Sequence, residues 1–289
     1  MARIYADEPV DVKNTLESGQ SFLWTREDDE RKDGGDKEAW YSAVVDGEGV
    51  RVRDAPDSGE NVIEYETTGL DEARVRELLG IDDPLDEIHD AITHDERVAR
   101  AVDVYGGMRV VSDPFFPCVV SFIVSAQNRI PRIRKLVNQM GREWGEPVEG
   151  YGHGFPSPET LAEVGEEPLR ELGLGYRAPY VVESARLVAD GVVSPNDIRR
   201  LPYGEAHDAV QELVGVGDKV GDCVLLFSLG FGEAVPLDTW MLKVVEEHYP
   251  EISGGSYDET ADAFRERFGE HAGYAQNYLF HYERHDGQE

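Results

Sequence analysis

Short runs of alternating apolar and polar positions occupy the first eighty residues, a pattern typical of β-strands with one buried face. The clearest runs are Ala39–Val45, Val50–Arg53 and Asn61–Glu66, with a turn between the first two. Almost every residue of Arg26–Glu38 is charged, which predicts a solvated hairpin loop. Residues 1–80 are therefore expected to form a small antiparallel β domain.

From about Asp71 the apolar positions change to helical spacing and keep it along the rest of the chain. Helices are predicted over Asp95–Tyr105, Pro117–Gln127, Pro131–Trp144, Ala178–Asp190, Asp218–Leu229, Thr239–Tyr249, Asp258–Phe268 and His271–Tyr282. The sequence thus predicts an α+β fold, in which the β domain of residues 1–80 precedes a mostly α-helical domain of residues 81–289.

Composition narrows the class of protein. Hydrophobic residues make up 40% of the 289 residues, enough for a buried core. No apolar run reaches the roughly 18–20 residues of a membrane helix, and the N-terminus lacks the pattern of a signal peptide. Two cysteines, Cys118 and Cys223, cannot form a four-cysteine zinc or iron–sulfur site, and His281 and His285 lack a third metal ligand. We expect a cytoplasmic, nucleoid-associated protein without metal or other cofactor.

The chain is strongly acidic, with 59 Asp and Glu against 28 Lys and Arg and a net charge of −31. Such an excess ordinarily repels polyanions. Because the excess extends along the whole chain, it is more typical of a halophile protein. In a cell interior with an ionic strength of 1 M the Debye length falls to ~3 Å, and surface carboxylates no longer repel one another. Net charge therefore does not exclude a nucleic-acid partner.

One stretch departs from this composition. Pro114–Arg142 contains no Asp or Glu at all. A buried helix explains missing acids at positions such as Phe122 and Val124, but it does not explain the basic residues of the same stretch. A basic face on an acidic protein is what phosphate binding requires. The basic residues are Arg129, Arg132, Arg134, Lys135 and Arg142.

A Gly-Val-Gly turn joins two predicted helices within Leu213–Val220. Gly215 and Gly217 let the backbone approach a phosphate closely, and the following helix presents free N–H groups at its positive end. Lys219 lies just inside that helix, with Asp218 placed to cap it. The helix dipole and partial burial both favour a neutral amine, a nucleophile able to form a Schiff base with a sugar carbon. A cationic contact with phosphate is the alternative role.

A second chemical feature follows at Ala234–Trp240. Pro236 sets a rigid turn, and Asp238 falls at the N-cap position of the next predicted helix. Capping alone is sufficient to explain this aspartate. A capped carboxylate is also fixed in place, so it can stabilise positive charge that develops at C1′ of a sugar as a base departs.

Five segments, in this order along the chain, resemble the helix-hairpin-helix superfamily of DNA glycosylases, and within it the eukaryotic type of 8-oxoguanine DNA glycosylase/AP lyase. LVGVGDKVGDC and AVPLDTW are similar to the hairpin-lysine and Pro-x-Asp segments of that family. Its N-terminal, damage-site and C-terminal pocket motifs are matched by Ser18–Trp24 (SGQSFLW), Leu172–Val181 (LGLGYRAPYV) and Ala272–Phe280 (AGYAQNYLF). The resemblance covers nearly the whole chain and implies a small β domain before a helical core.

The resemblance also implies roles around a flipped base. Cys223 and Phe280 would cover its two faces, and Gln276 would bond its Watson–Crick edge. The backbone carbonyl of Gly19 would accept a hydrogen bond from N7–H. Oxidation at C8 turns N7 from an acceptor into a donor, so this contact would separate 8-oxoguanine from guanine by ~2–4 kcal/mol.

For the duplex, the resemblance implies that Tyr176 wedges into the stack while Arg132 and Arg177 hold the orphaned cytosine. Simple packing of the tyrosine and solvation of the arginines are the alternatives.

Two positions depart from the family pattern. Gln127 stands where the commonest version has Asn, which leaves the filling of the vacated stack and the opposite-base preference open. Trp240 replaces a frequent His, so a phosphate contact is lost or passes to the indole N–H.

The predicted function is a bifunctional DNA glycosylase/AP lyase that excises 8-oxoguanine opposite cytosine. It would act as a monomer, with Lys219 attacking C1′, Asp238 stabilising the developing charge, and β-elimination nicking the strand. Two alternatives stay open: a glycosylase for another damaged base, and a non-catalytic helix-hairpin-helix DNA-binding protein. No cysteine follows Cys223, which argues against the cluster-bearing glycosylases for oxidised pyrimidines.

Overall fold

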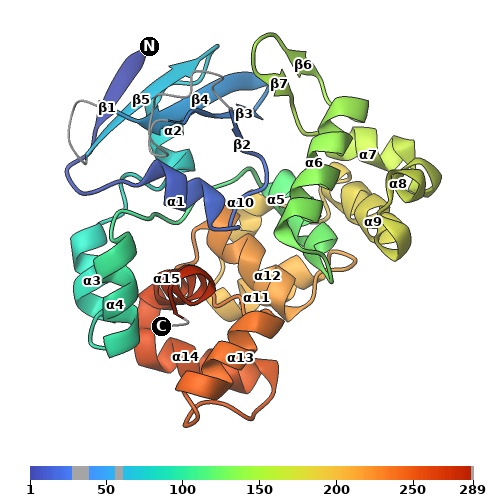
Figure 1. The fold of residues 1–289 in the computed structure, drawn as a ribbon. Coiled ribbons are helices and arrows are strands. Elements are labelled where there is room, and N and C mark those ends of the chain that lie inside the picture. The colour runs from blue at the N-terminus through green and yellow to red at the C-terminus, as the bar shows by residue number, and fades with distance from the viewer. Residues whose placement is uncertain (28–38, 56–60, 288–289) are drawn as a thin grey trace.

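A five-stranded antiparallel sheet forms the N-terminal part of the protein (Figure 1). The computed structural model describes residues 1–27, 39–55 and 61–287. The strand order across the sheet is β1–β5–β4–β3–β2. The strands are β1 (Ala2–Tyr5), β2 (Thr25–Arg26), β3 (Tyr41–Val45), β4 (Glu48–Asp54) and β5 (Val62–Thr67). The three strands predicted from alternation are confirmed as β3, β4 and β5.

Two strands of the sheet were not predicted. In β1 only Ile4 is buried, and β2 is two residues long, so neither has an alternating run that could reveal it. Both lie at the edges of the sheet, where one neighbour supplies all the pairing. The predicted charged loop Arg26–Glu38 lies mostly outside the described residues.

Outside this sheet, the regular secondary structure is helical except for a short hairpin formed by β6 (Pro147–Val148) and β7 (Gly152–His153). The α+β class is confirmed. No described helix is long and apolar enough to cross a membrane. The α-helices are α1 (Val12–Glu17), α2 (Glu72–Leu78), α3 (Leu85–Ile92), α4 (Glu96–Tyr105), α5 (Phe115–Ser125), α6 (Ile130–Trp144), α7 (Pro158–Val164), α8 (Glu166–Leu172), α9 (Ala178–Ala189), α10 (Pro195–Ile198), α11 (Tyr203–Gln211), α12 (Asp218–Val224), α13 (Thr239–His248), α14 (Tyr257–Phe268) and α15 (Ala272–His285).

The predicted helix Asp218–Leu229 divides into two parts. The α-helical part, α12, ends at Val224, and a π-helical stretch, η3 (Leu225–Leu229), continues it. Gly230, with φ of +80°, ends the whole element in the left-handed conformation that glycine adopts without strain. Sequence periodicity of 3.6 residues does not distinguish such a π-helical stretch from an α-helix.

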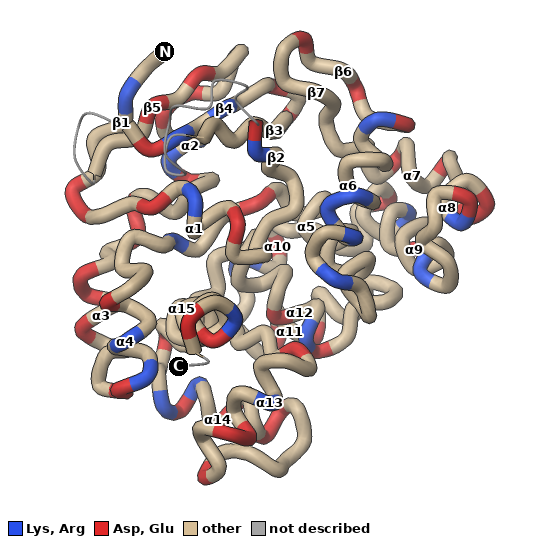
Figure 2. Tube along the Cα trace, viewed as in Figure 1, with Lys and Arg blue, Asp and Glu red and all other residues tan. Residues whose placement is uncertain are grey.

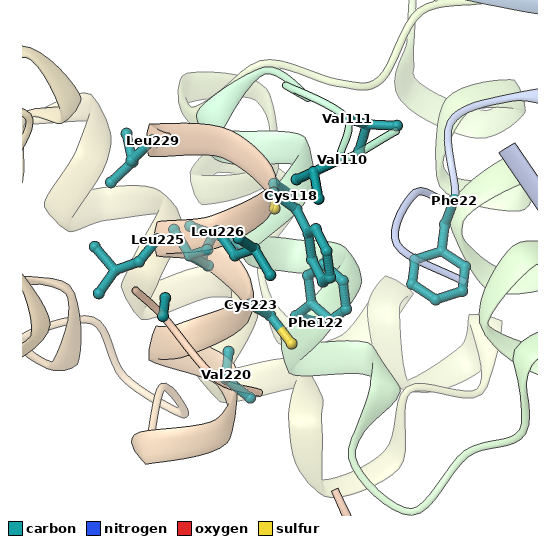
Figure 3. Packing of buried hydrophobic residues seen from close by; sticks show 14 of the residues in the cluster. Phe22, Val110, Val111, Cys118, Phe122, Val220, Cys223, Leu225, Leu226 and Leu229 are labelled. Atoms are coloured by element: carbon teal, nitrogen blue, oxygen red, sulfur yellow. The ribbon is translucent and has the colours of Figure 1, made fainter. Parts of the chain in front are cut away.

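The core centres on α5, which is buried along nearly its whole length and packs against the segment that carries Phe22 and against the α12–η3 element. Figure 3 shows Phe122 of α5 with Phe22 on one side and Cys223 on the other. The Phe122 ring lies 5.6 Å from the rings of both Phe22 and Phe227. This packing joins the N-terminal segment to the helix that carries Lys219, so the two parts of the fold share one hydrophobic cluster.

A buried arginine reinforces that junction. Arg109 is fully buried and donates to the carbonyl oxygens of Pro9 and Asp83 at 2.8 Å each. These bonds tie the segment after β1 to the segment between α2 and α3, on either side of Gly80. The division into domains at residue 80 remains a prediction.

Candidate active site

The hairpin between α11 and α12 holds its first glycine by two constraints. Gly215 has φ of +88°, and a Cβ there would lie 2.8 Å from the Cβ of Tyr180. Both the backbone conformation and the close approach of α9 therefore require glycine. Gly217 has open space where a Cβ would stand, so the start of α12 stays uncovered at the surface.

Asp218 does not cap α12 as predicted. It is the first residue of the helix, and the N-cap is Gly217, which has no side chain to offer. The Asp218 carboxylate instead accepts a hydrogen bond from Gln211 Nε2 at 2.8 Å. Gln211 ends α11, so this bond joins the two helices of the hairpin. The capping prediction was wrong because α12 begins one residue earlier than the cap assignment requires, so Asp218 lies inside the first turn.

Lys219 lies in the first turn of α12 and is half-buried. Its Nζ donates to Ser125 Oγ at 3.1 Å and lies 5.0 Å from the centre of the Phe122 ring. Both partners belong to α5. The amine is thus directed from the hairpin toward the interior, away from a purely superficial phosphate contact.

Cys223 lies one turn after Lys219 on α12 and is 2% exposed. Burial raises the pKa of its thiol to about 12, so the sulfur is protonated at neutral pH. Figure 3 shows this sulfur directed toward Phe122. Cys223 therefore presents a protonated, apolar side chain beside the lysine.

Asp238 is the N-cap of α13, as predicted. Its Oδ1 accepts hydrogen bonds from the backbone N–H groups of Trp240 at 3.0 Å and Met241 at 2.8 Å. These bonds hold the carboxylate at the positive end of the helix. Among the described residues none donates to Oδ2, and the carboxylate and Lys219 form no ion pair, which leaves both groups available to a ligand.

The N-terminal segment before β2 presents its backbone to the same region. Gly19 has φ of +94°, a left-handed backbone conformation that favours glycine, and a Cβ there would also lie 2.8 Å from Cδ1 of Ile130. The neighbouring Gln20 fixes the segment, since its Nε2 donates to the carbonyl oxygens of Thr15 at 2.8 Å and Arg109 at 2.7 Å. The Gly19 backbone is therefore held rigidly in position.

Helix α15 contributes Gln276 and Phe280, one turn apart. Gln276 is 4% exposed, and its Oε1 is buried without a hydrogen-bond partner among the described residues. An unpaired buried oxygen is costly, and a ligand that donates to it removes that cost. Phe280 is half-buried, and the guanidinium of Arg284 lies 5.0 Å from the centre of its ring.

All six residues assigned to catalysis and base binding line one cavity: Gly19, Lys219, Cys223, Asp238, Gln276 and Phe280. The sequence did not point to several other lining residues. Phe122 and Phe227 have the pattern of ordinary core positions, whereas Asn277 stands directly after Gln276 inside the C-terminal motif, which could have drawn attention to it. The other lining residues are Ser18, Gln20, Phe122, Phe227, Pro236 and Asn277.

The cavity combines apolar walls, a primary amine, a carboxylate and an unpaired amide. Such a set can bind a planar heterocycle and react at a carbon beside it. No group of three or more His, Cys, Asp or Glu side chains within residues 1–27, 39–55 and 61–287 is arranged to hold a metal ion.

A second cluster joins the turn after α5 to the loop before α9. Gln127 follows the end of α5, is exposed and has φ of +56°, a left-handed conformation that is uncommon outside glycine. The helix predicted to reach it ends at Ser125. Arg132 on α6 is exposed, and its Nη2 donates weakly to the carbonyl oxygen of Gly173 at 3.4 Å. The cluster thus exposes polar side chains at one edge.

Tyr176 and Arg177 belong to η2 (Gly175–Arg177), within the same cluster. Tyr176 is 48% exposed, as a wedge residue requires. Arg177 is 8% exposed, so default solvation was wrong for it. Its guanidinium carbon lies 4.3 Å from the centre of the Tyr176 ring, and Nη2 donates to the carbonyl oxygen of Ala126 beside Gln127. Stacking and this hydrogen bond draw it inward.

Trp240 packs against the core, and its Nε1 is buried without an acceptor in the described part of the chain. An indole N–H in this position does not reach a phosphate. Of the two outcomes predicted for this departure from the family pattern, the conformation favours loss of the phosphate contact.

The basic residues of the acid-free stretch all lie on α6 or at its N-cap, Arg129 (Figure 2). Arg129, Arg132, Lys135 and Arg142 are exposed. None of the five basic residues forms an ion pair with a carboxylate in the described ranges. This unpaired basic face borders the second cluster through Arg132.

Comparison with known proteins agrees with this geometry. A family model described as HhH-GPD superfamily base excision DNA repair protein matches residues 120–270, and one described as 8-oxoguanine DNA glycosylase, N-terminal domain, matches residues 3–119. The probable N-glycosylase/DNA lyase of Methanothermobacter thermautotrophicus is 33% identical over 222 residues, which cover 67% of this chain and 69% of that protein. The N-glycosylase/DNA lyase OGG1 of Arabidopsis thaliana is 30% identical over 286 residues, 92% of this chain and 75% of that protein.

A solved structure gives the same result. Clostridium acetobutylicum 8-oxoguanine glycosylase/lyase, in complex with dsDNA containing cytosine opposite to 8-oxoG, superposes with a TM-score of 0.84. The two chains are 28% identical, and the match covers 99% of each.

The fold is that of a helix-hairpin-helix base-excision repair protein. Its defining parts are the hairpin, the helix that carries the lysine and the capped aspartate. The chain belongs to the HhH-GPD superfamily of base excision DNA repair proteins, and it carries the N-terminal domain of the 8-oxoguanine DNA glycosylases.

Proposed function

We propose that this protein is a DNA N-glycosylase and AP lyase that removes 8-oxoguanine from duplex DNA in base excision repair. One observation carries the proposal: a primary amine, a capped carboxylate and an unpaired buried amide converge in a single cavity, from Lys219, Asp238 and Gln276. A module that only binds phosphates needs none of these groups inside a cavity.

The reaction begins when the damaged nucleotide is flipped out of the duplex into the cavity. Nζ of Lys219 exchanges its hydrogen bond to Ser125 for attack on C1′ through its lone pair. The N-glycosidic bond breaks, its electron pair leaves with the base, and a proton passes from the amine nitrogen to the base. Asp238 stabilises the positive charge that develops on the sugar. The sugar ring then opens to an imine, C2′ loses a proton, and rupture of the C3′–O3′ bond nicks the strand.

Base selection uses the walls and the edges of the cavity. Cys223 and Phe280 would contact the two faces of the base, and Gln276 would accept from or donate to its Watson–Crick edge. The rigidly held carbonyl of Gly19 would accept from N7–H, which 8-oxoguanine has and guanine lacks. With guanine, two acceptors would face each other, and this repulsion supplies the discrimination.

Duplex binding uses the second cluster and the hairpin. Tyr176 would insert beside the vacated position, with Gln127 filling the stack, and Arg132 and Arg177 would contact a cytosine opposite the lesion. Arg177 must leave the carbonyls of Ala126 and Leu174 to do so, because its Nη2 and Nη1 donate to them in the free protein. Gly215 and Gly217 would bring the hairpin backbone against a phosphate, and the α6 basic face would supply further phosphate contacts.

The same proposal includes a monomer that acts on chromosomal DNA in the cytoplasm. Every group that the reaction needs comes from one chain, so no second copy has to complete the site.

The test uses a duplex with a single 8-oxoguanine opposite cytosine. Base release, revealed by alkaline cleavage, and nicking at neutral pH are followed separately, with an undamaged duplex as the control. We expect both activities on the damaged duplex and neither on the control. Tight binding without base release would indicate the non-catalytic DNA-binding protein. Faster release of another damaged base would reassign the substrate.

A further inference from the structure

We propose that Tyr257 is a positioning residue that fixes the segment carrying Asp238 against the helix carrying Lys219. The link runs through a buried carboxylate, Asp222, to which Tyr257 is hydrogen-bonded. This inference rests on the proposed function and names a residue outside the cavity that sets the relative placement of the two catalytic groups.

Asp222 is the fixed end of the link. It stands on α12 between Lys219 and Cys223 and is fully buried. Its two oxygens are held by two tyrosines: Tyr203 donates to Oδ1 at 2.5 Å, and Tyr257 donates to Oδ2 at 2.6 Å. A buried carboxylate is costly unless its oxygens are paired, so both bonds strongly constrain α12.

Tyr257 also holds the segment before Asp238. It is the first residue of α14, and its hydroxyl oxygen accepts from the backbone N–H of Leu237 at 3.2 Å. The carbonyl oxygen of Val235 lies 3.0 Å from the same hydroxyl. The shorter distance to Asp222 assigns the single phenolic proton mainly to the carboxylate. The hydroxyl therefore joins α12 to residues on both sides of Pro236.

This placement matters because, among the described residues, the Asp238 carboxylate is hydrogen-bonded only to its own helix. Its carboxylate is held by backbone N–H groups of α13, and within the described residues no other side-chain hydrogen bond joins 235–238 to α12. Without the Tyr257 hydroxyl, the carboxylate stays capped but α13 can shift relative to Lys219. Misplacement of a catalytic group by a fraction of an ångström lowers the rate of the chemical step more than it lowers binding.

Tyr203 provides a matched control. It also donates one hydrogen bond to Asp222, but it stands on α11, and among the described residues it forms no hydrogen bond with residues 235–238. Its hydroxyl oxygen additionally accepts from Arg265 Nη1 at 2.8 Å. Tyr203→Phe and Tyr257→Phe thus each remove one bond from the same carboxylate, and only the second frees Leu237.

The experiment compares single-turnover rates of wild type, Tyr257→Phe and Tyr203→Phe on two duplexes, one with 8-oxoguanine and one with a preformed abasic site. We expect Tyr257→Phe to slow base release about tenfold, with affinity for the duplex and melting temperature close to those of Tyr203→Phe. Imine formation at the abasic site should slow less, because base departure, which Asp238 assists, has already occurred. Tyr203→Phe should release the base at close to the wild-type rate.

Equal slowing by both variants, or no slowing by Tyr257→Phe, would overturn the assignment. Amide hydrogen exchange at Leu237 gives a measurement independent of activity. Exchange should be faster in Tyr257→Phe than in wild type or Tyr203→Phe, and an unchanged rate would also overturn the link. Failure of the wild type to release 8-oxoguanine would instead count against the proposed function.

Discussion

The arginines of the β-sheet and the basic residues of α6 are used in opposite ways. On the sheet, Arg3 and Arg53 both bind the buried carboxylate of Glu64, at 2.8 and 2.6 Å, and Arg51 binds Glu66 at 2.5 Å. The four basic residues on α6 and Arg129 at its N-cap form no ion pair with a described carboxylate. Since acidic residues outnumber basic ones 59 to 28, this difference reflects placement and not a shortage of acids.

The comparison teaches where charge stabilises the protein and where it stays available to a partner. Paired arginines on the sheet neutralise carboxylates within the fold. Unpaired ones on α6 keep their full charge for an external anion, and they lie beside the residues proposed to contact the duplex. Net charge thus says less about the partner than the positions at which acid is absent.

The largest expected effect concerns the acidic surface outside α6. If that surface is adapted to salt, the protein should be unfolded in about 0.1 M KCl and folded in about 2 M KCl, because screening and bound cations relieve the repulsion among carboxylates. Far-ultraviolet circular dichroism across this range measures the transition. A stable and active fold in dilute buffer would contradict the salt adaptation.

The next prediction compares how α6 and the β-sheet contribute to DNA affinity. The double variant Arg132→Glu/Lys135→Glu should weaken binding to the lesion duplex about 100-fold, because it replaces two phosphate-binding charges by repulsive ones. Fluorescence anisotropy at fixed salt measures it. Arg51→Gln on the sheet is the control and should bind within about twofold of wild type. Similar losses in both would remove the distinction between the two regions.

A third prediction contrasts Glu64, which is paired with two arginines, with the buried carboxyl of Asp113, which is hydrogen-bonded to Ser21 and forms no ion pair with a described residue. Burial raises the pKa of Asp113 to about 7, and its Oδ1 has no partner in the described part of the chain. The folded state therefore holds this proton more tightly than the unfolded state, so stability falls as the pH rises from about 4 to 7. Asp113→Asn should stabilise the fold by about 2 kcal/mol at pH 8 and by less at pH 5. Urea unfolding at both pH values measures this.

Glu64 should respond to pH in the opposite direction. Burial alone would raise its pKa, but the hydrogen bonds from Arg3 and Arg53 outweigh burial and lower it. Its contribution to stability is thus present at neutral pH and is lost on acidification. The Asp113 prediction has its own contradicting outcome. If Asp113→Asn stabilises the protein equally at pH 5 and pH 8, ionisation of Asp113 is not the cause of the gain in stability.

The smallest effect lies within the sheet itself. Arg53→Gln leaves Glu64, which is 2% exposed, with one partner and should cost about 1–2 kcal/mol of unfolding free energy. Arg51→Gln affects Glu66, which is 28% exposed, and should cost less than about 1 kcal/mol. Equal costs would show that burial of the carboxylate does not decide the strength of these pairs.

Sequence patterns reveal the parts of the molecule that depend on local periodicity or on a short motif. Alternation predicts β4 because Val50 and Val52 are both fully buried on one face. The hairpin and Pro-x-Asp segments likewise predict Lys219 and Asp238. The capping role of Asp218 was wrong because the helix already begins at this residue, and its carboxylate pairs with Gln211 of the other helix of the hairpin.

Side-chain contacts between distant segments could not be predicted in this way. Ser125 binds Lys219 across 94 positions of the chain, and Tyr257 binds Asp222 across 35. Neither serine nor tyrosine stands in a pattern that marks a partner, because packing of whole helices brings each pair together. The cavity likewise depends on segments that share no periodicity.

Borohydride trapping is the most direct test of the central claim, that the Lys219 amine bonds to the sugar. The reagent reduces an imine to a stable amine and so joins the protein to the duplex. We predict a covalent complex with 8-oxoguanine DNA whose attachment maps to Lys219 by mass spectrometry, and none for Lys219→Gln although that variant still binds the duplex. Trapping that persists undiminished in Lys219→Gln, or base release by the wild type without any trapped complex, would contradict the account.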